Sequence, residues 1–174
     1  VPFLVSWPAK LPKDQRSDEL VCLTDLFGIA TGAAGQTEVR DGSDVLGMLS
    51  GDAEPRKNVI GLYGGPGRAD FKIMVREGDW KYIYLANGGR EQLFNLADDP
   101  SELTNCAGAN PETLKALRAT AVEICSRPEA EGAMEDGDLR SFPFEERERG
   151  RIYQFDRSRG VSGFPEKPED VLKG

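Results

Sequence analysis

Side chains that could do chemistry gather around a glycine-rich stretch near the middle of this chain. Gly64-Gly65-Pro66-Gly67 is followed directly by Arg68, and Lys72 comes shortly after it. A glycine-rich backbone can cradle an anion, and either cation could then reach it. The spacing matches neither the Walker nor the dinucleotide-binding fingerprint, and a strand rather than a helix is expected to follow. We therefore favour a hairpin loop that needs positive φ angles, and keep anion binding by Arg68 or Lys72 as the alternative.

Two other groups invite a functional interpretation. Asp98-Asp99-Pro100-Ser101-Glu102 has the carboxylates of a calcium site, but it lacks the alternating oxygen ligands and the distant glutamate of an EF-hand. A turn explains this stretch better. Trp80, Tyr82 and Tyr84 could form a sugar-stacking platform. Alternate aromatic residues on one strand face more often pack beneath a covering helix, and we favour that interpretation.

The chain offers no catalytic constellation. It contains no histidine, which removes the commonest general base, the commonest metal ligand and every triad built on imidazole. Its cysteines, Cys22, Cys106 and Cys125, do not have metal-binding spacing. We expect Cys22 to be a buried thiol in an apolar helix. Cys106 and Cys125 flank a predicted helix and could pair, although we favour free thiols.

Composition limits the classes of partner. The 174 residues carry a formal net charge of −8, and the isoelectric point is about 4.7. This charge argues against nucleic acid as a partner, and it would repel a polysulfated ligand unless basic residues cluster locally. Charged residues make up 30% of the chain, and no apolar run approaches the roughly 20 residues of a membrane helix. No targeting segment is recognised, and we expect no membrane partner.

The elements that must position these groups begin with an antiparallel sheet. Apolar and polar side chains alternate around Ile73, and aromatic side chains alternate with Lys81 and its neighbours. Alternation that is interrupted by glycine-bearing turns is typical of hairpins with one buried face. We predict four strands, at residues 58–63, 70–76, 80–86 and 91–96.

A helix is predicted at residues 111–126 to cover this sheet. Asn110 would cap it and Pro111 would take its first position. Its apolar stripe, at helical spacing, consists of Leu114, Leu117, Ala121, Ile124 and Cys125. A strongly acidic stretch without periodicity follows, and the chain then reads as an extended tail that wraps a surface.

The first 57 residues look like pieces of a larger domain. Residues 1–7 form a continuous apolar run, which is typical of a strand that is covered on both faces. A helix is expected from Leu20 to an end near Gly32 to Gly35, capped by Ser17-Asp18-Glu19, and it is apolar on more than one face. Residues 35–57 read as a polar connector with one helical turn near 44–49.

The predicted fold is therefore of the α+β class. A four-stranded antiparallel sheet covered by a helix is preceded by a strand and a helix that would complete a larger α/β domain. We divide the chain into residues 1–57 (end of the large domain, with the connector), 58–127 (small sheet-plus-helix domain) and 128–174 (extended tail).

Several motifs of this chain, and their order along it, resemble the carboxy-terminal region of the type I, formylglycine-dependent sulfatases of the alkaline phosphatase superfamily. The most specific motifs are Gly78-Asp79-Trp80-Lys81-Tyr82-Ile83 and Glu91-Gln92-Leu93-Phe94-Asn95-Leu96, followed by Asp99-Pro100, Glu102 and Asn105. Weaker matches upstream are Val1-Pro2-Phe3, Ser17-Asp18-Glu19-Leu20-Val21, Thr24-Asp25-Leu26, Asp41-Gly42-Ser43 and Leu49-Ser50-Gly51. The resemblance covers residues 1–127. It departs at Phe27-Gly28-Ile29, where the family commonly has proline and threonine.

The resemblance implies a parent enzyme that hydrolyses sulfate esters, on a carbohydrate, with calcium and a formylglycine nucleophile. That nucleophile arises in a Cys/Ser-x-Pro-x-Arg motif, which this chain lacks, because Cys125-Ser126-Arg127-Pro128 has the wrong order. No catalytic residue, metal ligand or cofactor can be assigned to the chain, and we expect it to be inactive alone. Its expected role is to shape the substrate cleft, with Tyr63, Arg68 and Lys72 as candidate substrate-binding residues.

The resemblance also suggests partners and a location. The expected partners are the amino-terminal part of the same sulfatase and a sulfated small molecule or glycan, and the isolated chain could self-associate. A periplasmic or extracellular location is suggested by the family. Two alternatives stay open: a phosphodiesterase or phosphonate hydrolase of the same superfamily, and an independent, non-catalytic binding module.

Overall fold

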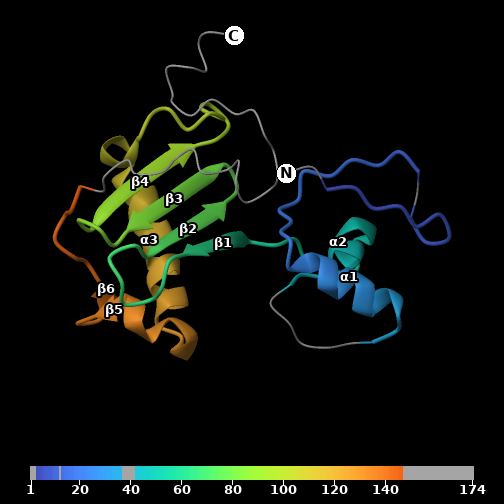
Figure 1. The fold of residues 1–174 in the computed structure, drawn as a ribbon. Helices are drawn as coiled ribbons and strands as arrows, with labels where there is room; N and C mark the ends of the chain where they lie inside the picture. Colours follow the sequence, from blue (N-terminus) through green and yellow to red (C-terminus); the bar gives the residue numbers. More distant parts are fainter. Residues whose placement is uncertain (1–2, 12, 37–41, 147–174) are drawn as a thin grey trace, which may run out of the picture. The chain divides into compact units, whose positions relative to one another are not determined.

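The computed structural model describes residues 3–11, 13–36 and 42–146 (Figure 1). Its helices are α1 (Asp25–Ala33), α2 (Val45–Ser50) and α3 (Pro111–Cys125), with 3₁₀ turns η1 (Ala107–Ala109) and η2 (Pro128–Ala133). Its strands are β1 (Asn58–Tyr63), β2 (Lys72–Glu77), β3 (Trp80–Leu85), β4 (Arg90–Asn95), β5 (Met134–Glu135) and β6 (Asp138–Leu139). The chain divides into two units, Val1–Pro143 and Phe144–Gly174, and only residues 144–146 of the second are described.

Strands β1 to β4 form an antiparallel meander in chain order, which confirms the predicted sheet (Figure 1). The register pairs Tyr63 with Lys72, Glu77 with Trp80 and Leu85 with Arg90. Glu77 and Trp80 close a two-residue hairpin in which Gly78 has φ of 55°. A positive φ at this position gives the turn the twist of the flanking strands, and glycine adopts it without steric cost.

One face of this sheet forms the core. Ile73, Val75, Tyr82 and Leu93 are fully buried, and Tyr84 is nearly so. Helix α3 covers this face with its apolar stripe, of which Leu117, Ala121 and Cys125 are buried. The predicted role of the aromatic residues is therefore confirmed for Tyr82 and Tyr84, which are buried in the core with α3, whereas Trp80 is only partly buried against this core. Asn110 differs from prediction: its side chain makes no capping hydrogen bond and donates instead to the Cys106 carbonyl.

The acidic stretch after α3 is ordered by contact with the core. Residues 128–139 form η2 and the small β5–β6 hairpin, and Ala133 and Leu139 are buried in the core cluster. Phe142 then pairs with the β3–β4 loop through its N–H to the Ala86 carbonyl at 2.9 Å. The extended tail expected from residue 128 is thus wrong for residues 128–143. Residues 128–139 show no apolar periodicity because their elements are too short for a regular helix. They pack on the core through a few apolar side chains instead.

The amino-terminal segment differs from the predicted strand and helix. Residues 3–7 are not in a strand, and 95% of Leu4 is exposed. A strand needs a hydrogen-bonded neighbour, and none of the described segments pairs with these residues. Helix α1 begins at Asp25 rather than Leu20. The buried Asp25 carboxylate accepts the Cys22 N–H at 2.7 Å, and the Asp25 N–H donates to the Cys22 carbonyl at 3.1 Å, so residues 22–25 form a turn before the helix.

Asp25 also ties α1 to the connector. It accepts the Ser43 N–H at 2.7 Å and forms an ion pair with Arg56, so its charge is met by donors from three segments. The predicted helical turn near residue 44 is confirmed as α2, which contacts α1. Asp44 caps it by accepting the Gly47 N–H at 2.9 Å, and Gly51 ends it in the left-handed conformation.

Candidate functional site

Two of the three predicted substrate-binding residues lie together at the edge of the sheet. Tyr63 ends β1, Lys72 begins β2, and they are cross-strand partners. The Lys72 ammonium lies over the Tyr63 ring, 5.1 Å from its centroid, while 63% of Tyr63 remains exposed. A cation over an aromatic face is attracted by the ring quadrupole. The pair therefore presents an aromatic and cationic surface to solvent at the edge strand.

Arg68 lies in the loop between these strands and pairs with a carboxylate there. Its Nε is 3.2 Å from Asp70 Oδ1, although 73% of the Arg68 side chain is exposed. Gly64 and Gly67 have φ of 77° and 78°, so the prediction of a loop that requires positive φ is confirmed. Among the described residues, no hydrogen bond or ion pair joins Arg68 to the Tyr63–Lys72 pair, and a common site for all three stays a prediction.

A fourth residue, Arg140, reaches the same loop. Gly132 of η2 packs against the loop so closely that a Cβ there would lie 3.0 Å from the Pro66 carbonyl carbon. This contact holds the β5–β6 hairpin beside the β1–β2 loop (Figure 1). Arg140, just after β6, consequently places its Nη1 3.6 Å from the point where a Gly67 Cβ would lie. Sequence spacing gives no sign of this approach, because 72 residues separate Arg68 from Arg140.

A polar network that is buried only at Tyr82 holds the scaffold behind the loop. Tyr82 donates its hydroxyl hydrogen to Glu91 at 2.6 Å, and Arg118 of α3 donates to the same carboxylate at 3.0 Å. Arg118 also donates to Asp138 of β6 at 2.8 Å. Burial and the neighbouring Glu91 raise the pKa of Tyr82, and the hydrogen bond from Arg118 lowers the pKa of Asp138. These residues join the sheet, α3 and the hairpin that carries Arg140.

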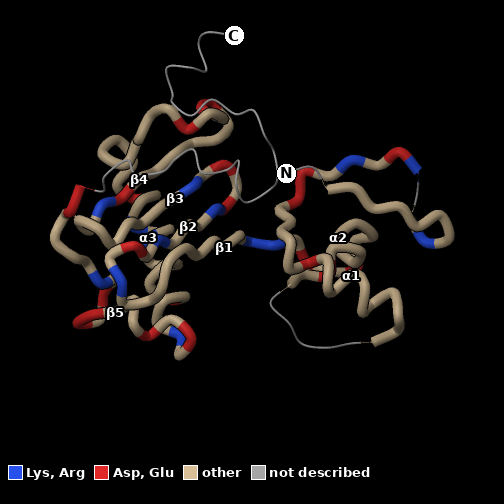
Figure 2. Tube along the Cα trace, viewed as in Figure 1, with Lys and Arg blue, Asp and Glu red and all other residues tan. Residues whose placement is uncertain are grey.

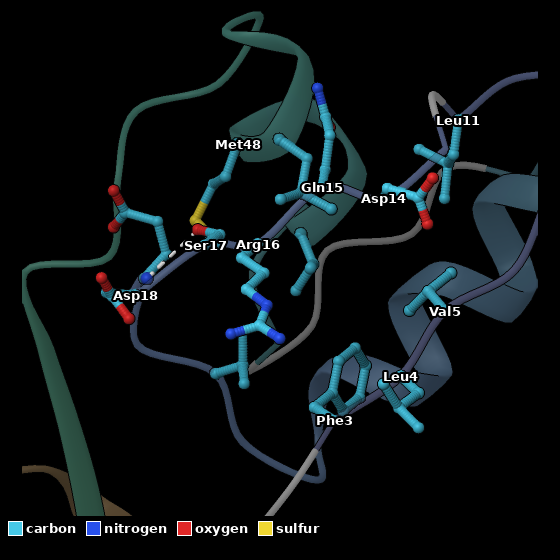
Figure 3. Close-up of a pocket in the computed structure, with 14 residues that line it drawn as sticks. Phe3, Leu4, Val5, Leu11, Asp14, Gln15, Arg16, Ser17, Asp18 and Met48 are labelled. Atoms are coloured by element: carbon cyan, nitrogen blue, oxygen red, sulfur yellow. Dashed lines mark hydrogen bonds between the residues drawn. The ribbon is translucent and has the colours of Figure 1, made fainter.

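A separate pocket of about 500 Å³ lies in the amino-terminal segment. Figure 3 shows Phe3, Leu4 and Val5 grouped at one end of it and Met48 at the other. The remaining lining includes three carboxylates and one guanidinium, from Asp14, Asp18, Glu19 and Arg16. This balance disfavours an anionic ligand, and none of the predicted substrate-binding residues lines the pocket.

In the part of the chain that the structure describes, neither a metal-binding cluster nor a disulfide is present. There, no group of three or more His, Cys, Asp or Glu side chains could hold a metal ion, so these residues do not fit the calcium expected of the parent. The described cysteines are free, and burial raises the pKa of the Cys125 thiol to about 11. Cys22 is only half-buried and accepts a hydrogen bond from Arg56 at 2.9 Å, unlike the buried helical thiol predicted.

The charged residues around the β1–β2 loop are of both signs. Figure 2 shows acidic and basic residues interspersed over the sheet, α3 and the loops. No helix among the described residues is long and apolar enough to cross a membrane. Against this mixed surface, the β1–β2 loop carries Arg68, with Lys72 and Arg140 beside it.

Comparison with known proteins shows similarity to sulfatases, although no family model matches the chain. Arylsulfatase K of Gallus gallus is 29% identical over 154 residues, which are 82% of this chain and 29% of that protein. A choline-sulfatase of Rhizobium meliloti (strain 1021) is 35% identical over 115 residues, which are 62% of this chain and 21% of that protein. This chain therefore spans less than a third of the length of either relative.

The fold agrees with these sequence matches. A solved structure described as a complex with its substrate D-glucosamine-2-N,6-O-disulfate aligns with a TM-score of 0.51 and 20% identity. The alignment covers 62% of this chain and 25% of that one. It includes enough of the chain to show a common fold. The chain is therefore similar to sulfatases over most of its length, which is consistent with a carboxy-terminal portion of a sulfatase.

Proposed function

We propose that this chain is the carboxy-terminal part of an enzyme that hydrolyses sulfate esters on carbohydrates. The observation that carries the proposal is the similarity to sulfatases over 82% of the chain, which includes the sheet and α3. The carbohydrate is supported by the disulfated glucosamine named as the substrate of one protein of the same fold. The sulfatase relatives give no support to a phosphodiesterase or to an independent binding module.

In this proposal the chain contributes substrate contacts rather than the reaction itself. The chain spans less than a third of the length of its relatives, and in the proposal the reacting groups belong to the amino-terminal part of the same protein. Calcium would be bound there, and a periplasmic or extracellular location would follow from the family. Tyr63, Arg68 and Lys72 would form one wall of the cleft, with Tyr63 and Lys72 positioned as a pair.

The test compares the whole protein with the 174-residue chain. We expect the whole protein to hydrolyse an aryl sulfate and a sulfated amino sugar, and to act far less on an aryl phosphodiester. The isolated chain should show no turnover of any of them. A whole protein that prefers the phosphodiester would overturn the proposal, as would sulfate release by the chain without any added protein.

A further inference from the structure

The two edges of the four-stranded sheet differ in how their backbone groups are satisfied. At the β4 edge, the Asn105 side chain accepts the Leu93 N–H at 2.9 Å and donates to the Glu91 carbonyl at 3.2 Å. The Cys106 N–H then donates to the Leu93 carbonyl at 2.9 Å. At the β1 edge, no described segment makes a backbone hydrogen bond to the outer side of the strand. Such an edge offers a row of donors and acceptors to another strand.

The hairpin register shows which backbone groups of β1 face outward. Glu77 and Trp80 flank a two-residue turn, and residues in this position exchange hydrogen bonds with each other. Because hydrogen-bonded and non-hydrogen-bonded pairs alternate, Asn58, which pairs with Glu77 from the other side, has its N–H and C=O directed away from β2. The same holds for Ile60 and Leu62. Applied to β4, this alternation gives outward groups at the positions that the segment after β4 binds.

The side chains of the β1 edge carry no charge. Ile60 packs against the core cluster on the face that α3 covers, and Leu62 lies on the same face because it is two residues further along. Helix α3 packs mainly on β2 and β3, so Leu62 stays 54% exposed although its cross-strand partner Ile73 is fully buried. Residues 58–63 contain neither a charged side chain nor a proline, which are common means of blocking an open edge.

We propose that β1 pairs with β1 of a second copy of this chain, antiparallel, with Ile60 at the twofold axis. Ile60 then exchanges hydrogen bonds with Ile60 of the second copy, and Leu62 exchanges them with Asn58 at both ends of the contact. This register uses every outward backbone group of Asn58, Ile60 and Leu62. It joins two four-stranded sheets into one continuous sheet.

The edge is complementary in shape to a second copy of itself. On the α3 face, Leu62 lies diagonally from Ile60 of the second copy, so apolar side chains that α3 leaves uncovered cover one another. On the other face, Val59 lies opposite Gly61 of the second copy. The Met74 methyl group is 3.1 Å from the place of a Gly61 Cβ, so Val59 meets an apolar surface there. Each copy thus provides what the other lacks.

The charges also permit two identical strands to meet. The nearest charged residue, Lys57, is about 20 Å from Lys57 of the second copy in this register, and the Debye length at physiological salt is about 8 Å. Tyr63 and Lys72 lie beyond the paired residues and stay with the proposed substrate surface. The contact is six residues long, so a weak dimer is expected. This pairing is independent of the proposed function.

The first experiment measures dimerisation of the whole protein by sedimentation velocity. Leu62→Lys should raise the dissociation constant about tenfold or more, because both copies lose apolar burial. Leu62→Pro tests the backbone pairing, since it removes an outward N–H and leaves the hydrogen bonds to β2 in place, and it should have a similar effect. Leu103→Lys is the matched control at a position that is 84% exposed, and it should leave the dissociation constant unchanged.

Two results of this experiment would overturn the proposal. One is a dimer that neither Leu62 variant weakens. The other is a whole protein that stays monomeric, which is the result expected if its own amino-terminal part covers the β1 edge.

The second experiment tests the register by amide hydrogen exchange, followed by NMR on the 174-residue chain. Phe27, which is 47% exposed, is replaced by Glu so that contacts through the amino-terminal segment are weakened. Protection of the Ile60 and Leu62 amides should rise with protein concentration, whereas the Gly61 amide, which faces β2, should be protected throughout. Ile60 and Leu62 amides whose exchange does not depend on concentration, whether fast or slow, would contradict the pairing.

Discussion

At the scale of single residues, Arg118 does most to organise the scaffold. It bridges Glu91 of β4 and Asp138 of β6, while Glu91 also accepts the hydroxyl hydrogen of the buried Tyr82. The hydrogen bond to Asp138 raises the pKa of Arg118 and lowers that of Asp138 from its usual 3.8. A carboxyl group with a lowered folded-state pKa stabilises the fold above its unfolded pKa. That stabilisation is lost as the pH falls through the folded value.

We therefore expect acid to weaken the sheet domain through Asp138. As the pH falls below about 4, urea unfolding should require less denaturant, and Asp138→Asn should reduce this dependence. Asp99, whose pKa is lowered chiefly by the Thr104 N–H, should account for part of the remaining dependence. Tryptophan fluorescence at a series of pH values measures the effect. Glu123→Gln, at an exposed helical position, should keep the original profile, and an Asp138→Asn profile identical to it would contradict the assignment.

At the scale of elements, the β1–β2 loop is shaped by backbone contact. Gly64 has φ of 77°, and a Cβ there would lie 2.6 Å from the Asp70 carbonyl oxygen. Gly78, in the next hairpin, also has a positive φ, but a Cβ there would meet nothing within 4 Å. The two glycines thus share a left-handed conformation and differ in the space around them.

This difference predicts unequal costs for the same substitution. Gly78→Ala should lower the free energy of unfolding by about 1 kcal/mol, from left-handed strain alone. Gly64→Ala should cost about 1 to 3 kcal/mol more, because the backbone must also move away from the added methyl group. Urea denaturation of the two variants gives both values. Equal losses would show that the loop at Gly64 is looser than its contacts indicate.

At the scale of the whole molecule, several large apolar side chains are exposed among the described residues. Leu4, Leu23, Leu26 and Phe27 are between 47% and 95% exposed in the amino-terminal segment. At the β1 edge, Leu62 is 54% exposed, and no other described strand pairs with the outer side of β1. Exposed apolar groups and open strand edges are typical of surfaces that bind another protein chain.

We expect the 174-residue chain to self-associate as its concentration rises. Phe27→Glu should weaken the association, because it places a charge among the exposed apolar residues of the amino-terminal segment. Leu103→Glu adds the same charge at a position that is 84% exposed, away from that segment in sequence, and should have little effect. Sedimentation velocity at several concentrations measures both. A chain that stays monomeric throughout would contradict this prediction.

The amino-acid sequence by itself determined the meander and its covering helix. Alternation around Ile73 and the stripe through Leu117 and Ala121 are local patterns, so the buried faces follow from neighbours along the chain. The strands that carry Tyr63 and Lys72 were predicted in the same way, but eight residues, 64–71, connect them, and the pairing of these two residues came from the structure. The strands and the covering helix need no knowledge of distant contacts.

Only the tertiary structure decided where distant segments meet. Helix α1 begins late because Asp25 is bound by Ser43 and Arg56 as well as by Cys22. Residues 3–7 are apolar enough for a strand but lack a partner among the described segments. Arg140 reaches Gly67 only because Gly132 packs on the loop. Contacts between residues far apart in sequence depend on packing, and packing leaves no local period in the sequence.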